Sequence, residues 1–199
     1  MFLQVIFLVS ILLLAIVYSS SRATYELLVS DENLFSDCPS PAEGTLNHNG
    51  LFDFSNFSTS MNEEGVTLAG SMTSVWNIQP EDRVEMDLAL LYFDRGNWQP
   101  TVFSLKSKDF CKSMYDEKQF WYKVWTGHVT NSKDVKDKCV HPGTKLEIEQ
   151  YVLSLTTAVP GQLRSGRYRA QLSFNAFPQG ETKRPPSICF EVVGDLLKL

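Results

Sequence analysis

Catalytic motifs are absent from this sequence. It contains no GxSxG, HExxH, P-loop or GxGxxG pattern, and its three histidines, His48, His128 and His141, stand in no recognisable motif. Glu147 and Glu149 fall on the outer face of a predicted strand, whereas general acid–base catalysis needs a desolvated site that tunes pKa values. The sequence therefore predicts a protein that is not an enzyme and that uses no cofactor.

The chain also lacks a CxxC pair and an excess of basic residues. Cys139 and His141 are close in sequence, but a disulfide explains the cysteine better than a metal does, so no metal site is expected. With 18 Lys and Arg against 23 Asp and Glu, the net charge of −5 argues against a nucleic-acid partner. No internal repeat or long linker is visible, which favours one domain of ordinary size.

The longest apolar run, from Phe2 to Val17, is shorter than the roughly 20 residues of a membrane span. Small residues follow it, in the pattern of a secretory signal peptide, although the run is preceded by no Lys or Arg. We expect a signal peptide over 1–23, cleaved after Ser19 or Ala23, with a retained anchor as the alternative. The predicted folded domain is 24–199, secreted to the extracellular space.

Four cysteines, Cys38, Cys111, Cys139 and Cys189, would then lie in an oxidising compartment. An even number predicts two disulfides, and four cysteines allow three pairings, which the spacing alone does not resolve. The NFS triplet at Asn56 is an N-glycosylation sequon, which the secretory context makes a candidate site.

Alternation of apolar and polar residues dominates the rest of the chain and predicts strands. Segments 81–98 and 166–177 alternate most clearly, and 65–78, 145–155 and 187–194 follow, with 24–30 and 49–57 as shorter candidates. The phase shifts near Glu149 and Gln150, which suggests a bulge. Asn56 shares parity with Phe52 and Phe54, so a glycosylated Asn56 requires the strand to end or bulge before it.

Turn signals such as QPED, DRGN and HPGT separate these segments. Seven or so strands joined by short turns predict an all-β protein, an antiparallel β-sandwich or β-cup. Its inward faces carry many large apolar residues, which fit either a packed core or sheets that splay around an apolar cavity.

The segment DEKQFWYKVWTGH concentrates four aromatic residues between Cys111 and Cys139. Residues 113–125 are predicted as either one short helix or an irregular lid, with the aromatics at the rim of a cavity and the charges in water. On this interpretation Trp121 and Trp125 are partly exposed, and replacing both would weaken ligand binding without unfolding the protein. The candidate ligand-binding residues are Trp76, Leu88, Leu90, Tyr92, Phe103, Phe120, Trp121, Tyr122, Trp125, Leu172 and Phe174.

Lysines flank both of these cysteines and could form a basic collar that contacts anionic headgroups at a membrane surface. Because Asp109, Asp134 and Asp137 are interspersed, a solvated surface of mixed charge is the favoured interpretation. The lysines are Lys106, Lys108, Lys112, Lys133, Lys136 and Lys138.

The order of these features resembles the insect chemosensory protein B family, which is similar to the ganglioside activator protein and to ML-type lipid-recognition domains. The resemblance rests on the signal peptide, Cys38, and the segments NGLFDFSNF, VWNIQPEDR, DRGNWQPTVFSLKSKDFCK, FWYKVW, CVHPGT, GRYRAQLSF and SICFEVVG. It implies a β-cup that holds a lipid, without catalysis, and the disulfides Cys38–Cys189 and Cys111–Cys139.

The resemblance further implies long-chain hydrocarbon pheromones or related lipids as ligands, and a sensory-neuron channel or receptor as partner. The alternative function is a secreted interaction module that lacks a lipid cavity and binds a partner protein through residues 120–125.

Overall fold

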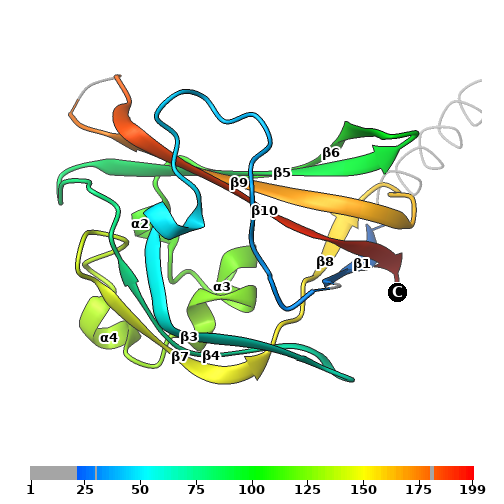
Figure 1. Cartoon of the computed structure of the whole chain (residues 1–199), viewed down its shortest axis with the longest axis horizontal. Helices are drawn as coiled ribbons and strands as arrows, with labels where there is room; N and C mark the ends of the chain where they lie inside the picture. Colours follow the sequence, from blue (N-terminus) through cyan, green and yellow to red (C-terminus); the bar gives the residue numbers. More distant parts are fainter. Residues whose placement is uncertain (1–21, 30, 180–181) are drawn as a thin grey trace, which may run out of the picture.

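Two antiparallel β-sheets face each other, with short helices between them at one end (Figure 1). The computed structural model describes residues 22–29, 31–179 and 182–199. The predicted all-β sandwich or cup is therefore confirmed. The expected signal peptide lies outside the described residues except for Arg22 and Ala23, which begin β1.

The described part of the chain contains ten strands and five short helices. The strands are β1 (Arg22–Val29), β2 (Ser36–Asp37), β3 (Phe52–Asn62), β4 (Gly65–Ser74), β5 (Arg83–Asp94), β6 (Asn97–Ser107), β7 (Lys145–Val152), β8 (Thr156–Pro160), β9 (Gly166–Phe177) and β10 (Arg184–Lys198). The helices are η1 (His48–Gly50), α2 (Phe110–Ser113), α3 (Phe120–Val124), η2 (Thr126–His128) and α4 (Ser132–Val135).

The larger sheet has the order β6–β5–β9–β10–β1–β8, and β2 pairs with β10 next to β1. Its central strands alternate as the sequence predicts: Val84, Met86 and Leu88 of β5 are buried, and the residues between them are more exposed. β9 continues the same face with Phe174, which pairs with Met86. This sheet therefore presents one continuous apolar face to the interior of the sandwich.

β3, β4 and β7 form the smaller sheet, which has two bulges. Opposite Leu68–Gly70 of β4, the partner strand β7 contains one extra residue. This confirms the bulge expected at Glu149 and Gln150. On the other side of β4, strand β3 also contains one extra residue between Asp53 and Asn56. This bulge precedes Asn56, as expected, and leaves its side chain exposed.

Gly70 lies between the two bulges and cannot be replaced without strain. Its φ is +108°, which favours glycine, and a Cβ atom there would lie 2.2 Å from the carbonyl oxygen of Asn56. The close approach of β3 to β4 at this point therefore depends on the missing side chain.

The segment around the aromatic cluster is not the single helix from 113 to 125 that the sequence allowed. α2 begins earlier, where the Asp109 side chain accepts from the Lys112 amide, and it ends at Ser113. The chain then turns before α3, η2 and α4 follow as separate short pieces. The apolar stripe is too irregular to sustain one helix, and each piece packs by its own buried residue.

The two disulfides are Cys38–Cys189 and Cys111–Cys139, the pairing that the family resemblance implies. The first bond, with Cα atoms 5.8 Å apart, attaches the segment after β2 to β10. The second, with Cα atoms 5.2 Å apart, joins α2 to the turn before β7. None of the short helices in the described part of the chain has the length or apolar content of a membrane span.

Candidate ligand-binding cavity

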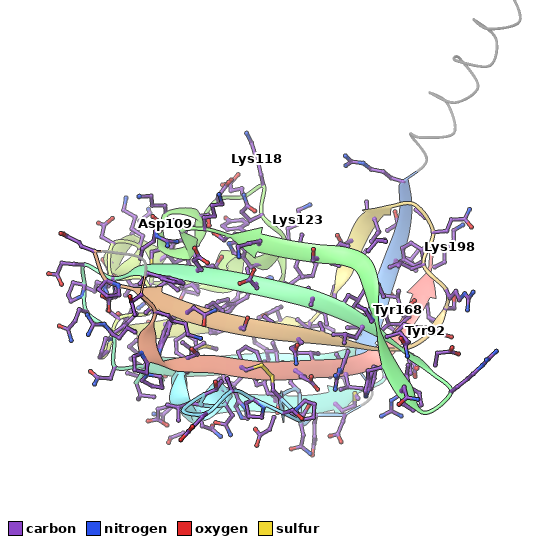
Figure 2. All side chains as sticks on the ribbon, turned by 90° about the horizontal axis from the view of Figure 1, so that it is seen from above. Tyr92, Asp109, Lys118, Lys123, Tyr168 and Lys198 are labelled. Carbon is purple, nitrogen blue, oxygen red and sulfur yellow. A yellow bond between two sulfur atoms is a disulfide. The ribbon has the colours of Figure 1, made fainter. Side chains whose placement is uncertain are left out.

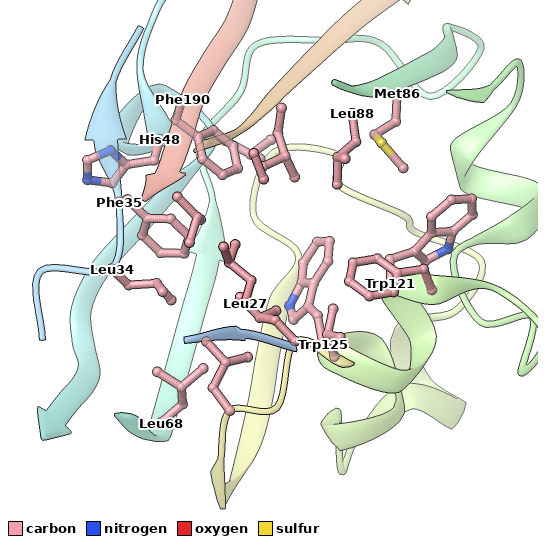
Figure 3. A pocket seen from close by; sticks show the side chains of 18 of the residues that line it. Leu27, Leu34, Phe35, His48, Leu68, Met86, Leu88, Trp121, Trp125 and Phe190 are labelled. Atoms are coloured by element: carbon pink, nitrogen blue, oxygen red, sulfur yellow. The ribbon is translucent and has the colours of Figure 1, made fainter. Parts of the chain in front are cut away.

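A cavity of about 180 Å³ lies between the two sheets and the helical segment (Figure 3). The larger sheet contributes residues of β1, β5, β6, β8, β9 and β10, and the smaller sheet contributes residues of β3, β4 and β7. In Figure 3, Trp121 and Trp125 lie on one side of the pocket and Phe35, His48 and Phe190 on the other. The cavity is thus lined by elements that are far apart in the sequence.

The wall of the cavity is almost entirely apolar. Among the described residues that line it, none is an aspartate, glutamate, lysine or arginine. The polar side-chain atoms of the lining belong to His48, Thr157, Tyr151 and the two tryptophans. A space with so few polar partners does not hold ordered water well, so it favours an apolar occupant.

The volume limits what fits without rearrangement. An engineered apolar cavity of about 150 Å³ stays dry and binds benzene, whereas ligand pockets commonly measure about 300–1,000 Å³. At about 180 Å³ the cavity accommodates a small apolar molecule or part of a long chain. A complete long-chain lipid would therefore have to extend out of the cavity or displace some of the large wall side chains.

Most of the residues predicted from the sequence as ligand-binding lie in this wall. They are Leu88, Leu90, Phe103, Phe120, Trp121, Trp125, Leu172 and Phe174. Three predicted residues lie elsewhere: Trp76, Tyr92 and Tyr122. Trp76 is fully buried and its Nε1–H donates to Pro186 O at 2.8 Å, so it belongs to the packed core.

Tyr92 and Tyr122 are also outside the wall. The ring of Tyr92 packs on Tyr168, with centroids 5.0 Å apart, in a second cluster toward the far end of the larger sheet (Figure 2). The ring and carbonyl of Tyr122 lie against Gly127 instead of the cavity. Alternation and aromatic content identify buried side chains, but they do not separate those that face the cavity from those packed elsewhere.

The sequence did not indicate the aromatic side of the cavity formed by Phe35, His48, Phe54 and Phe190. The His48 ring lies 5.3 Å from Phe35 and 5.7 Å from Phe54, and Phe35 meets Phe190 edge-on at 5.2 Å. Phe35 and His48 come from a loop and a single 3₁₀ turn, which carry no periodic signal. Burial lowers the pKa of His48 from its ordinary value, and Asp37 opposes this shift only in part.

The expectation that Trp121 is a partly exposed rim residue is wrong. Its side chain is 8% exposed, and its Nε1–H donates to Ser113 O at 2.9 Å. Trp125 is half-buried and its ring stacks on Phe110, with centroids 6.0 Å apart. Because α3 turns these rings inward, the segment forms a wall of the cavity, while Lys118 and Lys123 project into solvent (Figure 2).

Specific contacts hold this wall in place. The hydroxyl of Thr126 donates to Met114 O, and the hydroxyl of Tyr151 donates to Val124 O at 2.8 Å. An isolated bridge joins Val129 to Ile148 of β7. The helical segment is therefore attached to the smaller sheet at several points besides the Cys111–Cys139 bond.

The charged residues near that bond form a mixed surface, as the sequence favoured. Lys112 pairs with Asp109 at 2.7 Å, and Lys106 lies 3.2 Å from Asp87. A polar groove beside the disulfide also contains Tyr115, and burial raises the pKa of Tyr115 to about 12. Within the described ranges, no group of three or more His, Cys, Asp or Glu is placed to hold a metal ion.

No model of a known protein family matches this chain, and no curated protein matches it significantly.

Proposed function

We propose that this chain is a binding protein for an apolar, lipid-like ligand that occupies the cavity between the two sheets. The observation that carries the proposal is the partly open cavity of about 180 Å³ between the sheets, whose lining has no charged residue among those described. A packed core leaves few voids larger than a water molecule, so an apolar cavity of this size needs an explanation. A removable apolar occupant explains it.

The resemblance to the chemosensory protein B family supports a narrower proposal for the ligand and its use. The protein would be secreted, take up a long-chain hydrocarbon pheromone or a related lipid, and present it to a channel or receptor of a sensory neuron. The two disulfides support an oxidising, extracellular location. Because the cavity is smaller than such a ligand, a long chain would extend out of its opening or displace wall side chains.

The alternative, an interaction module that binds a partner through residues 120–125, has less support. Phe120, Trp121 and Trp125 of this segment face the cavity. None of the large apolar residues in the segment is among those exposed on the surface. The segment therefore offers a partner protein little apolar surface.

The test is uptake of N-phenyl-1-naphthylamine, a dye whose fluorescence rises in apolar surroundings, together with native mass spectrometry of protein secreted from animal cells. Ala170 lines the cavity, so the larger side chain of Ala170→Leu should fill part of it. The matched control is Ala89→Leu, because Ala89 is exposed on β5 beside Leu90, the strand partner of Ala170.

We expect the parent protein and the Ala89→Leu variant to bind the dye equally, and the Ala170→Leu variant to bind it more weakly. If the parent protein takes up no dye and carries no bound lipid, the proposed function is wrong.

A further inference from the structure

The indole N–H groups of Trp76, Trp121 and Trp125 are all shielded from solvent or hydrogen-bonded, but only two of them have an acceptor in the described part of the chain. The Nε1–H of Trp76 donates to Pro186 O, and that of Trp121 donates to Ser113 O. The Nε1–H of Trp125 is also shielded from solvent, but it finds no acceptor among the described residues. Leaving a buried donor without a partner is costly, and native proteins rarely do so without a reason.

The Trp125 ring is held in a fixed orientation by two cavity residues. It stacks on Phe110 with an interplanar angle of 11°, and it meets Phe52 edge-on with centroids 5.8 Å apart. Figure 3 shows the indole reaching into the pocket from the helical side. Because its neighbours fix the ring, they also fix the direction of the N–H bond, so the donor is already oriented before a ligand arrives.

The chemistry of the wall defines the group that would satisfy this donor. An indole N–H only donates, so its partner must be an acceptor. A carboxylate is excluded because burying it would require a cation, and no described lining residue is Lys or Arg. A hydroxyl would bring a donor of its own into an apolar space. Among uncharged groups that accept without donating, a carbonyl oxygen is a stronger acceptor than an ether oxygen, so it suits this donor best.

We propose that Trp125 Nε1 is the polar anchor of the cavity, and that the ligand is an uncharged apolar molecule carrying a carbonyl oxygen, such as an aliphatic ketone or ester. This inference rests on the proposed function and narrows it, since a pure hydrocarbon would leave the donor unsatisfied. His48 Nδ1 is a second unpartnered atom in the wall. A neutral imidazole can leave one nitrogen bare, so His48 makes no comparable demand for an acceptor.

The probes are decane and 2-decanone, which differ by one carbonyl group and are much shorter than a long-chain lipid, so that most of each chain lies in the cavity. Each displaces N-phenyl-1-naphthylamine from the disulfide-bonded protein, in the parent and in the Trp125→Phe variant, which removes the N–H and keeps an aromatic ring. We expect Trp125→Phe to lower the affinity for the ketone relative to decane by roughly two- to tenfold, the usual effect of one hydrogen bond. Because the ratio of the two affinities is compared between the parent and the variant, the difference in hydration free energy between the two probes cancels.

The matched control is Trp98→Phe. Trp98 lies on β6 outside the cavity, with the Arg169 guanidinium 4.7 Å from its ring, so this variant should leave the ratio of affinities unchanged. An unchanged ratio in Trp125→Phe would overturn the anchor. If decane and 2-decanone both fail to displace dye that the parent protein does bind, the ligand class is wrong while the cavity stands. If the parent protein binds no dye, the proposed function fails as well.

A measurement on the parent protein keeps the inference testable even if Trp125→Phe does not fold. In a spectrum of ¹⁵N-labelled indole N–H groups, 2-decanone should shift the Trp125 signal downfield and decane should not, because only the ketone accepts a hydrogen bond. Equal shifts with both probes would contradict the proposal.

Discussion

The imidazole of His128 lies flat on the ring of Tyr151, with centroids 3.6 Å apart and an interplanar angle of 7°. His128 Nδ1 lies 2.8 Å from Glu149 Oε1, and the Tyr151 hydroxyl donates to Val124 O. Tyr151 also lines the cavity. One residue of β7 therefore lines the cavity and contacts two parts of the helical wall.

Replacing Tyr151 by Phe should loosen this wall. The ring and its stacking stay, but the bond to Val124 O is lost, at a cost of about 0.5–1.5 kcal/mol in the free energy of unfolding. Urea unfolding measures the loss, and hydrogen exchange should rise first over residues 120–128. Tyr122→Phe is the control, because no hydrogen bond of the Tyr122 hydroxyl is seen among the described residues. Equal effects of the two variants would show that the bond contributes nothing.

Trp121 and Trp125 should differ when each is replaced by Ala. Trp121 is buried and hydrogen-bonded, so Trp121→Ala should cost about 3–5 kcal/mol, a large part of the roughly 5–15 kcal/mol of an ordinary domain. Trp125 is half-buried, so its replacement should cost less stability but still weaken dye binding. Thermal unfolding and dye titration on each variant test this. A Trp121→Ala protein as stable as the parent would contradict its place in the core.

The two disulfides should contribute unequally to stability. In the chain-entropy model, closing the 28-residue separation of Cys111 and Cys139 stabilises the fold by about 3–4 kcal/mol, and the 151-residue separation of Cys38 and Cys189 by about 5 kcal/mol. Paired Cys→Ser variants, compared by guanidinium unfolding, should follow this order. Peptide mapping without reductant should recover both pairs, and a Cys38–Cys111 or Cys38–Cys139 peptide would refute the assignment.

Asn56 should carry an N-glycan in protein secreted from animal cells. The β3 bulge leaves its side chain exposed, so the sequon is accessible on the folded surface. Enzymatic deglycosylation should lower the mass of the parent protein and leave Asn56→Gln unchanged. Ser58→Thr keeps the sequon and should behave as the parent does. Secreted parent protein without a mass shift would mean that Asn56 is not modified.

Asp82 should make the protein sensitive to acid. Burial alone would raise its pKa, but hydrogen bonds from Arg184, at 2.5 and 3.0 Å, and from the Gln79 amide hold the pKa below its ordinary value of 3.8. Because the pKa of Asp82 is lower in the folded than in the unfolded protein, its ionised carboxylate adds to the free energy of unfolding. This contribution is complete above pH 3.8 and is lost as the pH falls through the pKa of the folded state.

Asp82→Asn should therefore cost about 1–3 kcal/mol at neutral pH and flatten the loss of stability in acid. Urea unfolding on both sides of pH 3.8 measures this, with exposed Glu43→Gln as the control. If both variants retain the acid loss of the parent, Asp82 is not its source.

The alternation of apolar and polar residues predicted the strands better than it predicted the lining of the cavity. β5 and β9 were evident because each buries alternate residues in the middle of a sheet. β6 was missed because it is an edge strand that contains Pro100 and exposes Val102, and an edge tolerates both. β8 was missed because its five residues depend on pairing with β1.

The cavity could be predicted only in part, because its shape depends on how the two sheets pack. The alternation predicts that Leu88 and Trp76 both face inward, yet only Leu88 lines the cavity. Phe54 lines the cavity next to a bulge, where the alternation no longer tells which way a side chain points. Whether a buried side chain faces the cavity or the packed core depends on contacts between strands far apart in the sequence. The periodicity of one strand carries no information about these contacts.

The two disulfides are nested, since Cys111 and Cys139 both lie between Cys38 and Cys189. At a synthesis rate of about 5–20 residues per second, Cys189 is made roughly 8–30 seconds after Cys38, because 151 residues separate them. Cys111 and Cys139 emerge during that interval, so oxidation in the order of synthesis would join Cys38 to the wrong thiol. Under oxidation in that order, native pairing in an oxidising compartment would require reshuffling, and the yield of native protein should rise with the supply of disulfide isomerase.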